Sequence, residues 1–218
     1  MEISEFLAVE SCKKDFTASS KEEAVRAIAR LIAASPRVNG DLEDEIAEGL
    51  LAREKLGSTG FGDGIAVPHC KVEGMESFAM ALAISPRGVP FKAMDNRSVH
   101  IVCGIAGPES DPDTHLRLLA AAARILSISR VRYEIVRSAS RYALREAFLY
   151  HTSISAACQI DGEACRKLMV VRTLALSRTP SPSSVRKSNE PRFPIKSSLN
   201  SARLFLNMNS RFTNIPTR

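Results

Sequence analysis

REKLGSTGFGDGIAVPHCK runs from Arg53 to Lys71 and places four glycines and a proline directly before a histidine. The glycines alone are compatible with a simple surface turn: Gly57, Gly60, Gly62 and Gly64. Pro68, however, restricts its own backbone and biases Val67 toward an extended conformation, so we expect His69 on a stiffened segment. The stretch is not a P-loop, because no Gly-Lys-Ser or Gly-Lys-Thr closes it. It is not a dinucleotide fingerprint, because no strand precedes it.

Two helices are predicted before this stretch. Residues 19–36 carry apolar side chains at helical spacing, and a serine, Ser19 or Ser20, can cap the first turn together with a following glutamate. Residues 41–57 repeat the pattern, with Asp41 as the expected cap. The second helix is expected to bury a face made of Leu42, Ile46 and Leu50.

Strands and helices alternate after the stretch. Residues 77–85 and 98–107 are short apolar runs bounded by turn residues, which is typical of buried strands, and the segment between them is loop-like. Residues 111–127 predict a helix that is capped by Asp113 and Thr114. Its expected buried face consists of Leu116, Leu119, Ala120 and Ala123. Two more helical segments follow, near residues 130–138 and 140–150. This alternation indicates an α/β layered domain.

The composition changes near residue 152, where we place a domain boundary. Residues 153–218, the basic tail, hold 11 Lys and Arg against 3 Asp and Glu, which leaves 19 and 21 of the chain's 30 and 24 for residues 1–152. The tail is rich in Ser, Pro and Arg and is expected to be mostly disordered, apart from one short helix at 165–176. The nearly neutral body has no general nucleic-acid footprint, although the tail leaves RNA binding open.

The cysteines and the apolar runs point to a cytoplasmic protein. Five cysteines are scattered without a CxxC pair, which favours reduced thiols over a disulfide scaffold or a zinc site. No apolar run approaches the ~20 residues that a membrane helix needs, so no membrane insertion is expected. No secretory signal is visible at the start of the chain.

Two histidines and an arginine suggest a site for a phosphoryl group. His115 opens a predicted helix, where backbone N–H groups favour an anion, and Arg53 ends the helix before the glycines. The hydroxyls of Ser58 and Thr59 lie in the same loop. Histidine can act as a covalent nucleophile, and phosphoryl transfer mainly needs positioning and neutralisation of charge. On this hypothesis the glycines let a partner protein approach His69 closely.

Residues 53–69 resemble the phosphorylation-site signature of enzyme IIA proteins of the bacterial phosphoenolpyruvate-dependent sugar phosphotransferase system. The resemblance is to the fructose/mannitol type, which includes nitrogen-regulatory enzyme IIA. Residues 90–109 and 114–126 resemble the family's intervening strand region and its second histidine motif, and the likeness extends over roughly residues 5–150. Cys70 departs from the pattern, since glycine is common there, and its side chain is expected either to crowd the docking face or to form a reactive thiol.

The resemblance implies a fold, a site and partners. It implies an α/β (α+β) fold with a mixed sheet of about five strands and helices on both faces, which needs no cofactor or metal. His69 would accept phosphate, on Nε2, from the histidine-containing phosphocarrier protein. His115 would hydrogen-bond the phosphoryl group and Arg53 would neutralise charge, beside the phosphoryl-site loop that consists of Gly57, Ser58, Thr59, Gly60, Gly62, Gly64 and Pro68.

Two functions fit this resemblance. A nitrogen-regulatory enzyme IIA controls partner proteins by its phosphorylation state, and the absence of an attached IIB or IIC unit favours this reading. The alternative is a sugar-specific enzyme IIA that passes phosphate to an enzyme IIB. Among the other histidines we expect His100 to be structural and His151 to be solvated. Cys103 is expected in the core, and Lys71 either on the docking surface or simply in solvent.

Overall fold

The computed structural model describes residues 3–160, with side chains described through Ser153. The basic tail beyond residue 160 lies outside the described residues, and with it the predictions of disorder and of a short helix at 165–176. The last described helix, α5 (Arg141–Ile160), continues past the boundary predicted near residue 152, so the extent of the first domain stays a prediction.

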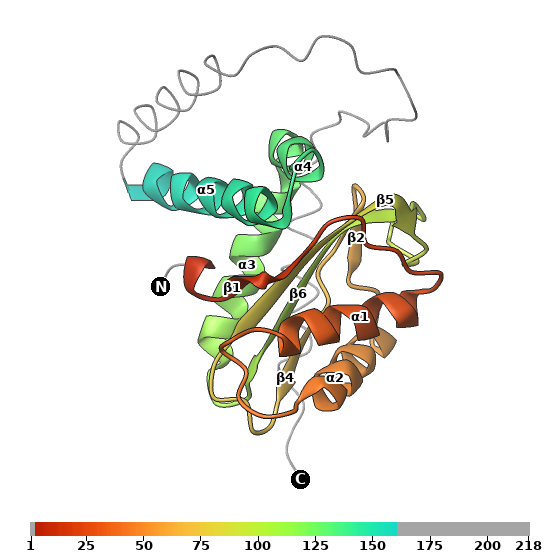
Figure 1. Ribbon diagram of the computed structural model, residues 1–218, viewed down its shortest axis with the longest axis vertical. Coiled ribbons are helices and arrows are strands. Elements are labelled where there is room, and N and C mark those ends of the chain that lie inside the picture. Colours follow the sequence, from red (N-terminus) through yellow and green to blue (C-terminus); the bar gives the residue numbers. More distant parts are fainter. Residues whose placement is uncertain (1–2, 161–218) are drawn as a thin grey trace.

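A mixed sheet of six strands, one more than expected, forms the centre of the fold (Figure 1). Its strands run in the order β1-β5-β6-β3-β2, and β4 also pairs with β6. The two long strands β5 and β6 are antiparallel, whereas β1 runs parallel to β5 and both β3 and β4 run parallel to β6. The strand bounds are β1 Leu7–Lys13, β2 Gly60–Gly62, β3 Ile65–Ala66, β4 His69–Val72, β5 Ala79–Val89 and β6 Val99–Pro108.

The two predicted strands are confirmed, although β5 runs four residues into the segment that the sequence indicated as a loop. The strand β6 is buried along almost its whole length, which explains its uninterrupted apolar sequence. The strands β3 and β4 lie one after the other along β6, separated by Val67 and Pro68. Proline has no N–H to donate, and the Pro68 carbonyl instead accepts from Ile105 N–H at 3.0 Å.

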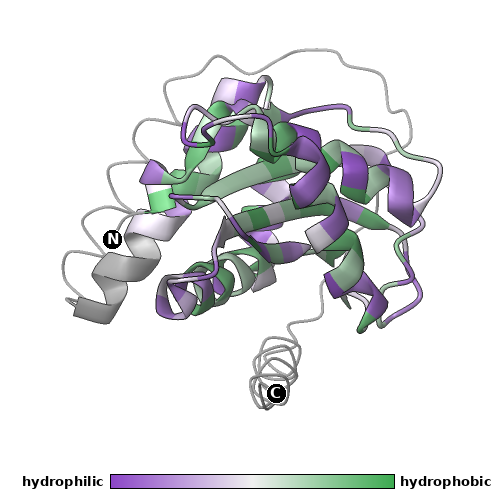
Figure 2. Cartoon of the chain, turned by 90° about the horizontal axis from the view of Figure 1, so that it is seen from below, coloured by the Kyte–Doolittle hydropathy of each residue, from purple (hydrophilic) through white to green (hydrophobic). Residues whose placement is uncertain are grey.

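Helices cover both faces of the sheet, as expected (Figures 1 and 2). One core lies between the sheet and the helices α1 (Lys21–Ala33) and α2 (Glu43–Lys55). The other lies between the sheet and α3 (Pro112–Ser127), α4 (Ser129–Val136), α5 and the short 3-10 helix η1 (Ile3–Glu5). Figure 2 shows hydrophobic residues along the strands and on one side of the helices.

The cap of α1 is confirmed, but the other two predicted caps are wrong. Ser20 accepts from Glu23 N–H at 3.1 Å and opens α1. In α2 the N-cap position is Leu42, without a side-chain bond, instead of Asp41. In α3 the cap is Asp111, whose carboxylate accepts from Thr114 N–H at 2.9 Å.

The start and the buried face of α3 both differ from the prediction. Pro112 occupies the first helical position, where its fixed φ suits the helix, and this moves the cap to the residue before it. Leu116 is 44% exposed, contrary to the prediction, and Ala120 is only partly buried, while Leu119 and Ala123 are buried as predicted. The face that packs on the sheet includes His115, Leu118, Leu119, Ala122, Ala123, Ile125 and Leu126.

Arg145 of α5 ties the end of the described chain to its beginning. Its Nε donates to the Leu7 carbonyl at 2.6 Å and its Nη2 donates to the Ser4 carbonyl at 3.2 Å. Leu7 opens the edge strand β1, so this arginine holds α5 against one border of the sheet.

Candidate functional site

His69 is the first residue of β4 and is almost fully buried, with 4% of its surface exposed. It pairs with Ile105 of β6 in the parallel register, directly after Pro68. The expected extended, stiffened segment is therefore present, and the parallel pairing on β6 fixes where the imidazole lies.

Hydrogen bonds define the tautomer of His69. Its Nδ1 lies 2.8 Å from the Val67 carbonyl, and because a carbonyl oxygen only accepts, Nδ1 must carry the proton. The lone pair is then on Nε2, where the Nε–H of Arg53 donates to it at 3.0 Å. The two contacts agree with each other, and they leave Nε2 as the nucleophilic nitrogen of a neutral ring.

Arg53 is held in place by the loop that follows α2. Its Nη1 donates to the Gly57 carbonyl at 3.1 Å, so the guanidinium contacts both the loop and His69. Burial lowers the pKa of Arg53, and the nearby Glu54 carboxylate works in the opposite direction.

His115 lies beside His69, as the resemblance implied. The ring centroids are 5.6 Å apart, with the planes tilted by 60°, and the centroid of the Phe78 ring lies 6.1 Å from that of His115. The Nδ1 of His115 is buried and has no hydrogen-bond partner among the described residues. The N-terminus of α3 already has an anion of its own, because the Asp111 carboxylate binds the Thr114 N–H.

Both histidines are held neutral by their surroundings. The pKa of His69 is lowered to about 3, mainly by burial; the Val67 hydrogen bond raises this pKa, and Arg53 and His115 contribute to lowering it. Burial also lowers the pKa of His115 to about 4, with smaller contributions from Lys71 and Arg53. Two neutral imidazoles and one guanidinium can receive an anion, because these side chains can donate hydrogen bonds to it and none of them carries a negative charge that would repel it.

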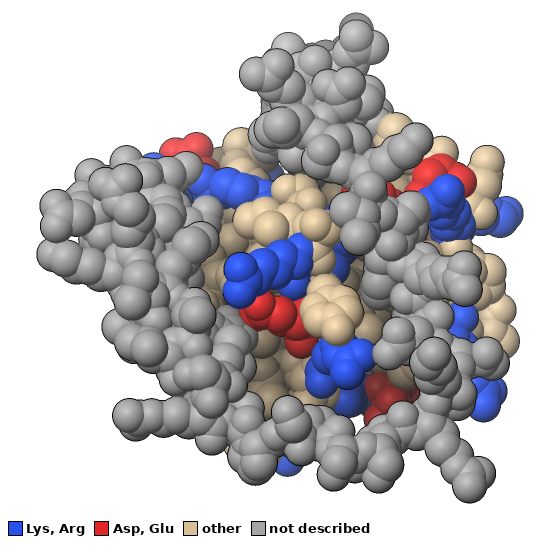
Figure 3. All heavy atoms as spheres, turned by 90° about the horizontal axis from the view of Figure 1, so that it is seen from above, with Lys and Arg blue, Asp and Glu red and all other residues tan. Residues whose placement is uncertain are grey.

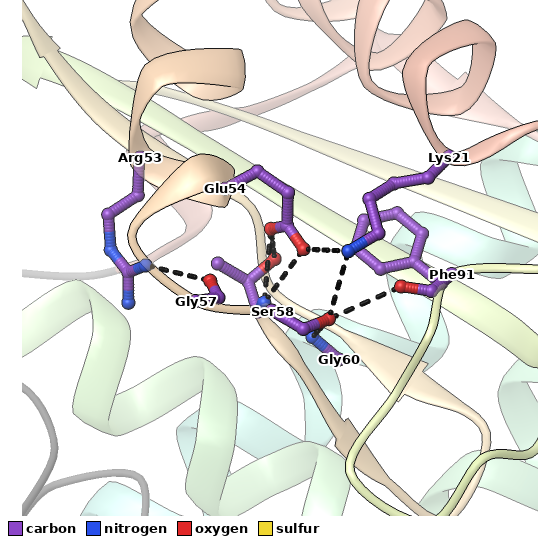
Figure 4. A network of polar contacts seen from close by, with 8 residues as sticks. Lys21, Arg53, Glu54, Gly57, Ser58, Gly60 and Phe91 are labelled. Atoms are coloured by element: carbon purple, nitrogen blue, oxygen red, sulfur yellow. Dashed lines mark hydrogen bonds and ion pairs between the residues drawn. The ribbon is translucent and has the colours of Figure 1, made fainter.

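The hydroxyls of the loop point away from this pair. Thr59 Oγ1 donates to the Glu54 carboxylate at 2.6 Å, and Ser58 Oγ donates to the Phe91 carbonyl at 3.2 Å (Figure 4). In the structure, therefore, both predicted hydroxyls donate to groups other than His69 and His115. Glu54 was not among the predicted site residues; its position next to Arg53 and before two hydroxyl residues was the available signal.

Three of the four glycines before His69 meet local demands of the fold. Gly62 and Gly64 have φ angles of 101° and 74°, which favour glycine in the tight turn between β2 and β3. A Cβ on Gly60 would lie 2.9 Å from the Cβ of Ala93. Gly60, Gly62 and Gly64 are buried, whereas Gly57 is partly exposed, and the role of the glycines in the approach of a partner protein stays a prediction.

Cys70 neither crowds the docking face nor forms an exposed thiol, so both expectations for it are wrong. Successive residues of a strand point to opposite faces, and Cys70 packs in the core under α1 and α2 while His69 faces α3. Its Sγ lies 3.7 Å from the Ile46 carbonyl, and burial raises its pKa to about 12. Cys103 is fully buried in the other core, as predicted.

The remaining predicted residues lie away from the site or at its edge. His100 Nδ1 contacts the Ser85 carbonyl at 2.9 Å, which fits the predicted structural role. His151 is not solvated as predicted, because its Nε2 lies 2.9 Å from a Glu134 carboxylate oxygen and its side chain is only 15% exposed. Lys71 is exposed two residues after His69.

The described part of the chain holds neither a metal-binding cluster nor a membrane-spanning helix. Within residues 3–160, no three His, Cys, Asp or Glu side chains come together in a group that could hold a metal ion. None of the helices in this range is long and apolar enough to cross a bilayer.

Two relatives show what the sequence is similar to. The chain is 40% identical over 114 residues to a nitrogen regulatory protein of Pseudomonas aeruginosa, which covers 52% of this chain and 72% of that protein. It is 30% identical over 128 residues to a fructose-specific enzyme IIA component of the phosphotransferase system from Haloferax volcanii, covering 59% and 82%.

Solved structures share the fold, and a family model covers most of the described residues. The nitrogen regulatory protein IIA-Ntr of Neisseria meningitidis superposes with a TM-score of 0.62 at 27% identity, over 67% of this chain and 98% of that one. The mannitol enzyme IIA of Escherichia coli, solved in complex with phosphorylated mannitol enzyme IIB, superposes with a TM-score of 0.55 at 22% identity, over 65% and 95%. Residues 5–150 match the model of "Phosphoenolpyruvate-dependent sugar phosphotransferase system, EIIA 2". With this match, the chain belongs to the type-2 enzyme IIA family of the phosphotransferase system, whose members carry phosphoryl groups between proteins.

Proposed function

We propose that His69 accepts a phosphoryl group on Nε2 from a histidine-containing phosphocarrier protein. The observation that carries this proposal is the bond from Nδ1–H of His69 to the Val67 carbonyl, which leaves the lone pair on Nε2. This pair forms the new N–P bond while the bond from phosphorus to the donor nitrogen breaks, and the donor ring keeps that electron pair. No proton has to leave Nε2 during the transfer.

Arg53 and His115 stabilise the phosphoryl group in this proposal. The Nε–H of Arg53 now donates to Nε2, so it must turn from the nitrogen to the incoming equatorial oxygens. The tilted His115 ring lies close enough to His69 to offer an N–H to one of these oxygens, and its Nδ1 has no bond to give up among the described residues. The positive charge of Arg53 compensates the charge that collects on the phosphoryl oxygens.

The proposed role is that of a nitrogen-regulatory enzyme IIA in the cytoplasm, which controls partner proteins by its phosphorylation state. The 40% identity to the nitrogen regulatory protein of Pseudomonas aeruginosa supports this assignment. The alternative is a sugar-specific enzyme IIA that passes phosphate to an enzyme IIB, which the likeness to the fructose-specific component supports. Nucleic acid is not a proposed partner, and the face drawn in Figure 3 shows acidic side chains beside the basic ones.

A label-transfer experiment separates the two roles. The full chain is incubated with labelled phosphoenolpyruvate, the upstream carriers and each candidate enzyme IIB, and the label on every protein is followed over time. Label that reaches this chain and stays there supports the regulatory role, whereas rapid passage to one enzyme IIB supports the sugar-specific role. Failure of the chain to take up any label contradicts the proposed function.

A further inference from the structure

Glu54 follows Arg53 in α2, yet its side chain turns to the opposite side of the loop (Figure 4). The side chain is 4% exposed and its carboxylate is fully engaged. It accepts from the Thr59 N–H at 3.1 and 3.0 Å, from the Thr59 hydroxyl at 2.6 Å and from the Lys21 ammonium at 2.8 Å. A buried carboxylate with this many charge-assisted bonds is a rigid anchor for the groups that donate to it.

The anchor extends through the loop to a neighbouring segment. Lys21 also reaches Ser58 Oγ at 3.4 Å and lies 5.4 Å from the centre of the Phe91 ring. Ser58 Oγ donates to the Phe91 carbonyl at 3.2 Å and accepts from the Gly60 N–H at 3.3 Å. Residues 58–60 are therefore fixed on both sides, by Glu54 and by Phe91.

Two chains of contacts lead from this loop to His69. In the first, the Gly57 carbonyl accepts from Arg53 Nη1 at 3.1 Å, and the same guanidinium donates from Nε to His69 Nε2. The loop that Glu54 holds therefore also sets the orientation of the guanidinium.

The second chain reaches the other nitrogen of the ring. The Thr59 carbonyl accepts from the Val67 N–H at 3.1 Å, and the Val67 carbonyl accepts from the Nδ1–H of His69 at 2.8 Å. Glu54 holds Thr59 at its N–H and hydroxyl, so it also fixes the carbonyl that selects the tautomer of His69.

We infer that Glu54 is a positioning residue, which sets both the tautomer of His69 and the orientation of Arg53 through the peptide groups of Thr59, Val67 and Gly57. This inference rests on the proposed function, because the importance of Nε2 follows from phosphoryl transfer. Glu54 contacts neither the proposed nucleophile nor the phosphoryl group. Its negative charge also favours the charged form of Arg53 against the effect of burial.

The test measures two quantities separately: the protonation of the two ring nitrogens of His69 and the rate of phosphoryl transfer. Histidine labelled with a nitrogen isotope is incorporated into the full chain, and the two ring-nitrogen signals of unphosphorylated His69 are recorded by NMR. Wild-type protein should give one protonated and one unprotonated nitrogen. In Glu54→Gln the two signals should move toward each other, because both tautomers become populated, and phosphoryl acceptance should slow by about tenfold or more.

Three further variants make the result decisive. Thr59→Val removes only the hydroxyl bond and should show a smaller change in the same direction, and Thr59→Ser, which keeps the hydroxyl, should restore wild-type signals. The matched control is Glu134→Gln, which should leave the His69 signals unchanged; Glu134 is a partly buried glutamate of α4 that contacts Arg130 and, on α5, His151.

The inference is overturned if Glu54→Gln and Thr59→Val alter only the melting temperature while the His69 signals match those of Glu134→Gln. Loss of folding in both variants also overturns it, because Glu54 would then act on stability alone. The NMR signals come from unphosphorylated protein. A failure of wild-type phosphorylation would therefore contradict the proposed function without touching the assignment of Glu54.

Discussion

The Nε–H of Arg53 lies 3.0 Å from Nε2 of His69, the same nitrogen that we propose takes the phosphoryl group. In the unphosphorylated protein the arginine thus occupies the place of the incoming phosphorus. Because His69 is also buried, transfer requires Arg53 to move aside, and the moving group then becomes a partner of the phosphoryl oxygens. On this proposal Arg53 donates to Nε2 in the unphosphorylated protein and compensates the charge of the phosphoryl oxygens after transfer.

Replacing His69 should abolish phosphorylation without unfolding the protein. His69→Ala removes the only nitrogen that we propose as acceptor, so acid-labile, base-stable label from phosphoenolpyruvate should disappear while the far-UV circular dichroism persists. His100→Ala is the matched control and should keep full labelling, because His100 lies at the Ser85 carbonyl instead. Full labelling of His69→Ala would sink the assignment.

Replacing His115 should slow transfer without preventing it. One charge-assisted hydrogen bond contributes roughly 1.5–3 kcal/mol, so His115→Ala should lower the rate by about tenfold to a hundredfold. His115→Gln keeps an N–H donor and should recover part of the rate. Rapid-quench measurements of transfer to and from the protein check this. Wild-type rates for His115→Ala in both directions would show that this histidine is purely structural.

The stability of the protein should fall in mild acid because of the two buried histidines. Their folded pKa values, about 3 for His69 and about 4 for His115, lie below the ordinary value of 6.5, so the unfolded chain binds protons that the folded chain does not. Their contribution is complete above pH 6.5 and is lost as the pH falls toward 3. Each neutral histidine can contribute a slope of up to about 1.4 kcal/mol per pH unit.

Urea unfolding at several pH values between 7 and 4 measures this slope. Carboxylates titrate in the same range, so the comparison is between wild type and His69→Gln, in which the carboxylates are unchanged. The substituted protein should lose less stability per pH unit. Equal slopes in the two proteins would show that the pKa of His69 is the same in the folded and unfolded states, which contradicts this prediction.

Gly49 and Cys70 should be energetically coupled. A Cβ on Gly49 would lie 3.1 Å from the Cβ and 3.3 Å from the Sγ of Cys70. Alanine favours a helix over glycine by about 1 kcal/mol, but the crowding opposes this gain. Gly49→Ala should therefore stabilise the protein more in a Cys70→Gly background than in the wild type. A double-mutant cycle of unfolding free energies checks this, and strict additivity contradicts it.

The sequence predicted the parts of the fold that depend on long periodic segments. The helices and the strands β5 and β6 have enough residues for their pattern to be recognised, and Pro68 marks the extended entry to His69. The strands β2 and β3 have three and two residues, too few for any period, and they form through tertiary pairing, β3 with β6 and β2 with β3. The strand β1 carries polar residues at several positions and was missed for that reason.

The site was predicted where residue type decides the chemistry and was missed where tertiary contacts decide it. His69, His115 and Arg53 are brought together as expected. The direction of Cys70 could have been inferred, because neighbours in a strand point to opposite faces and His69 had been placed toward the site. The burial of Glu54 was harder to infer, because its position before two hydroxyl residues hints at a contact but does not distinguish a surface glutamate from a buried one.

Arg145 also has a consequence for assembly. An outer strand with unpaired carbonyls is a template on which a strand from another molecule can add, and such addition leads to aggregation. Here a guanidinium from α5 binds the Leu7 carbonyl at the border of the sheet and the Ser4 carbonyl in the preceding 3-10 helix. The Leu7 acceptor is thereby withheld from a foreign strand, so α5 protects the start of β1 against edge-to-edge addition.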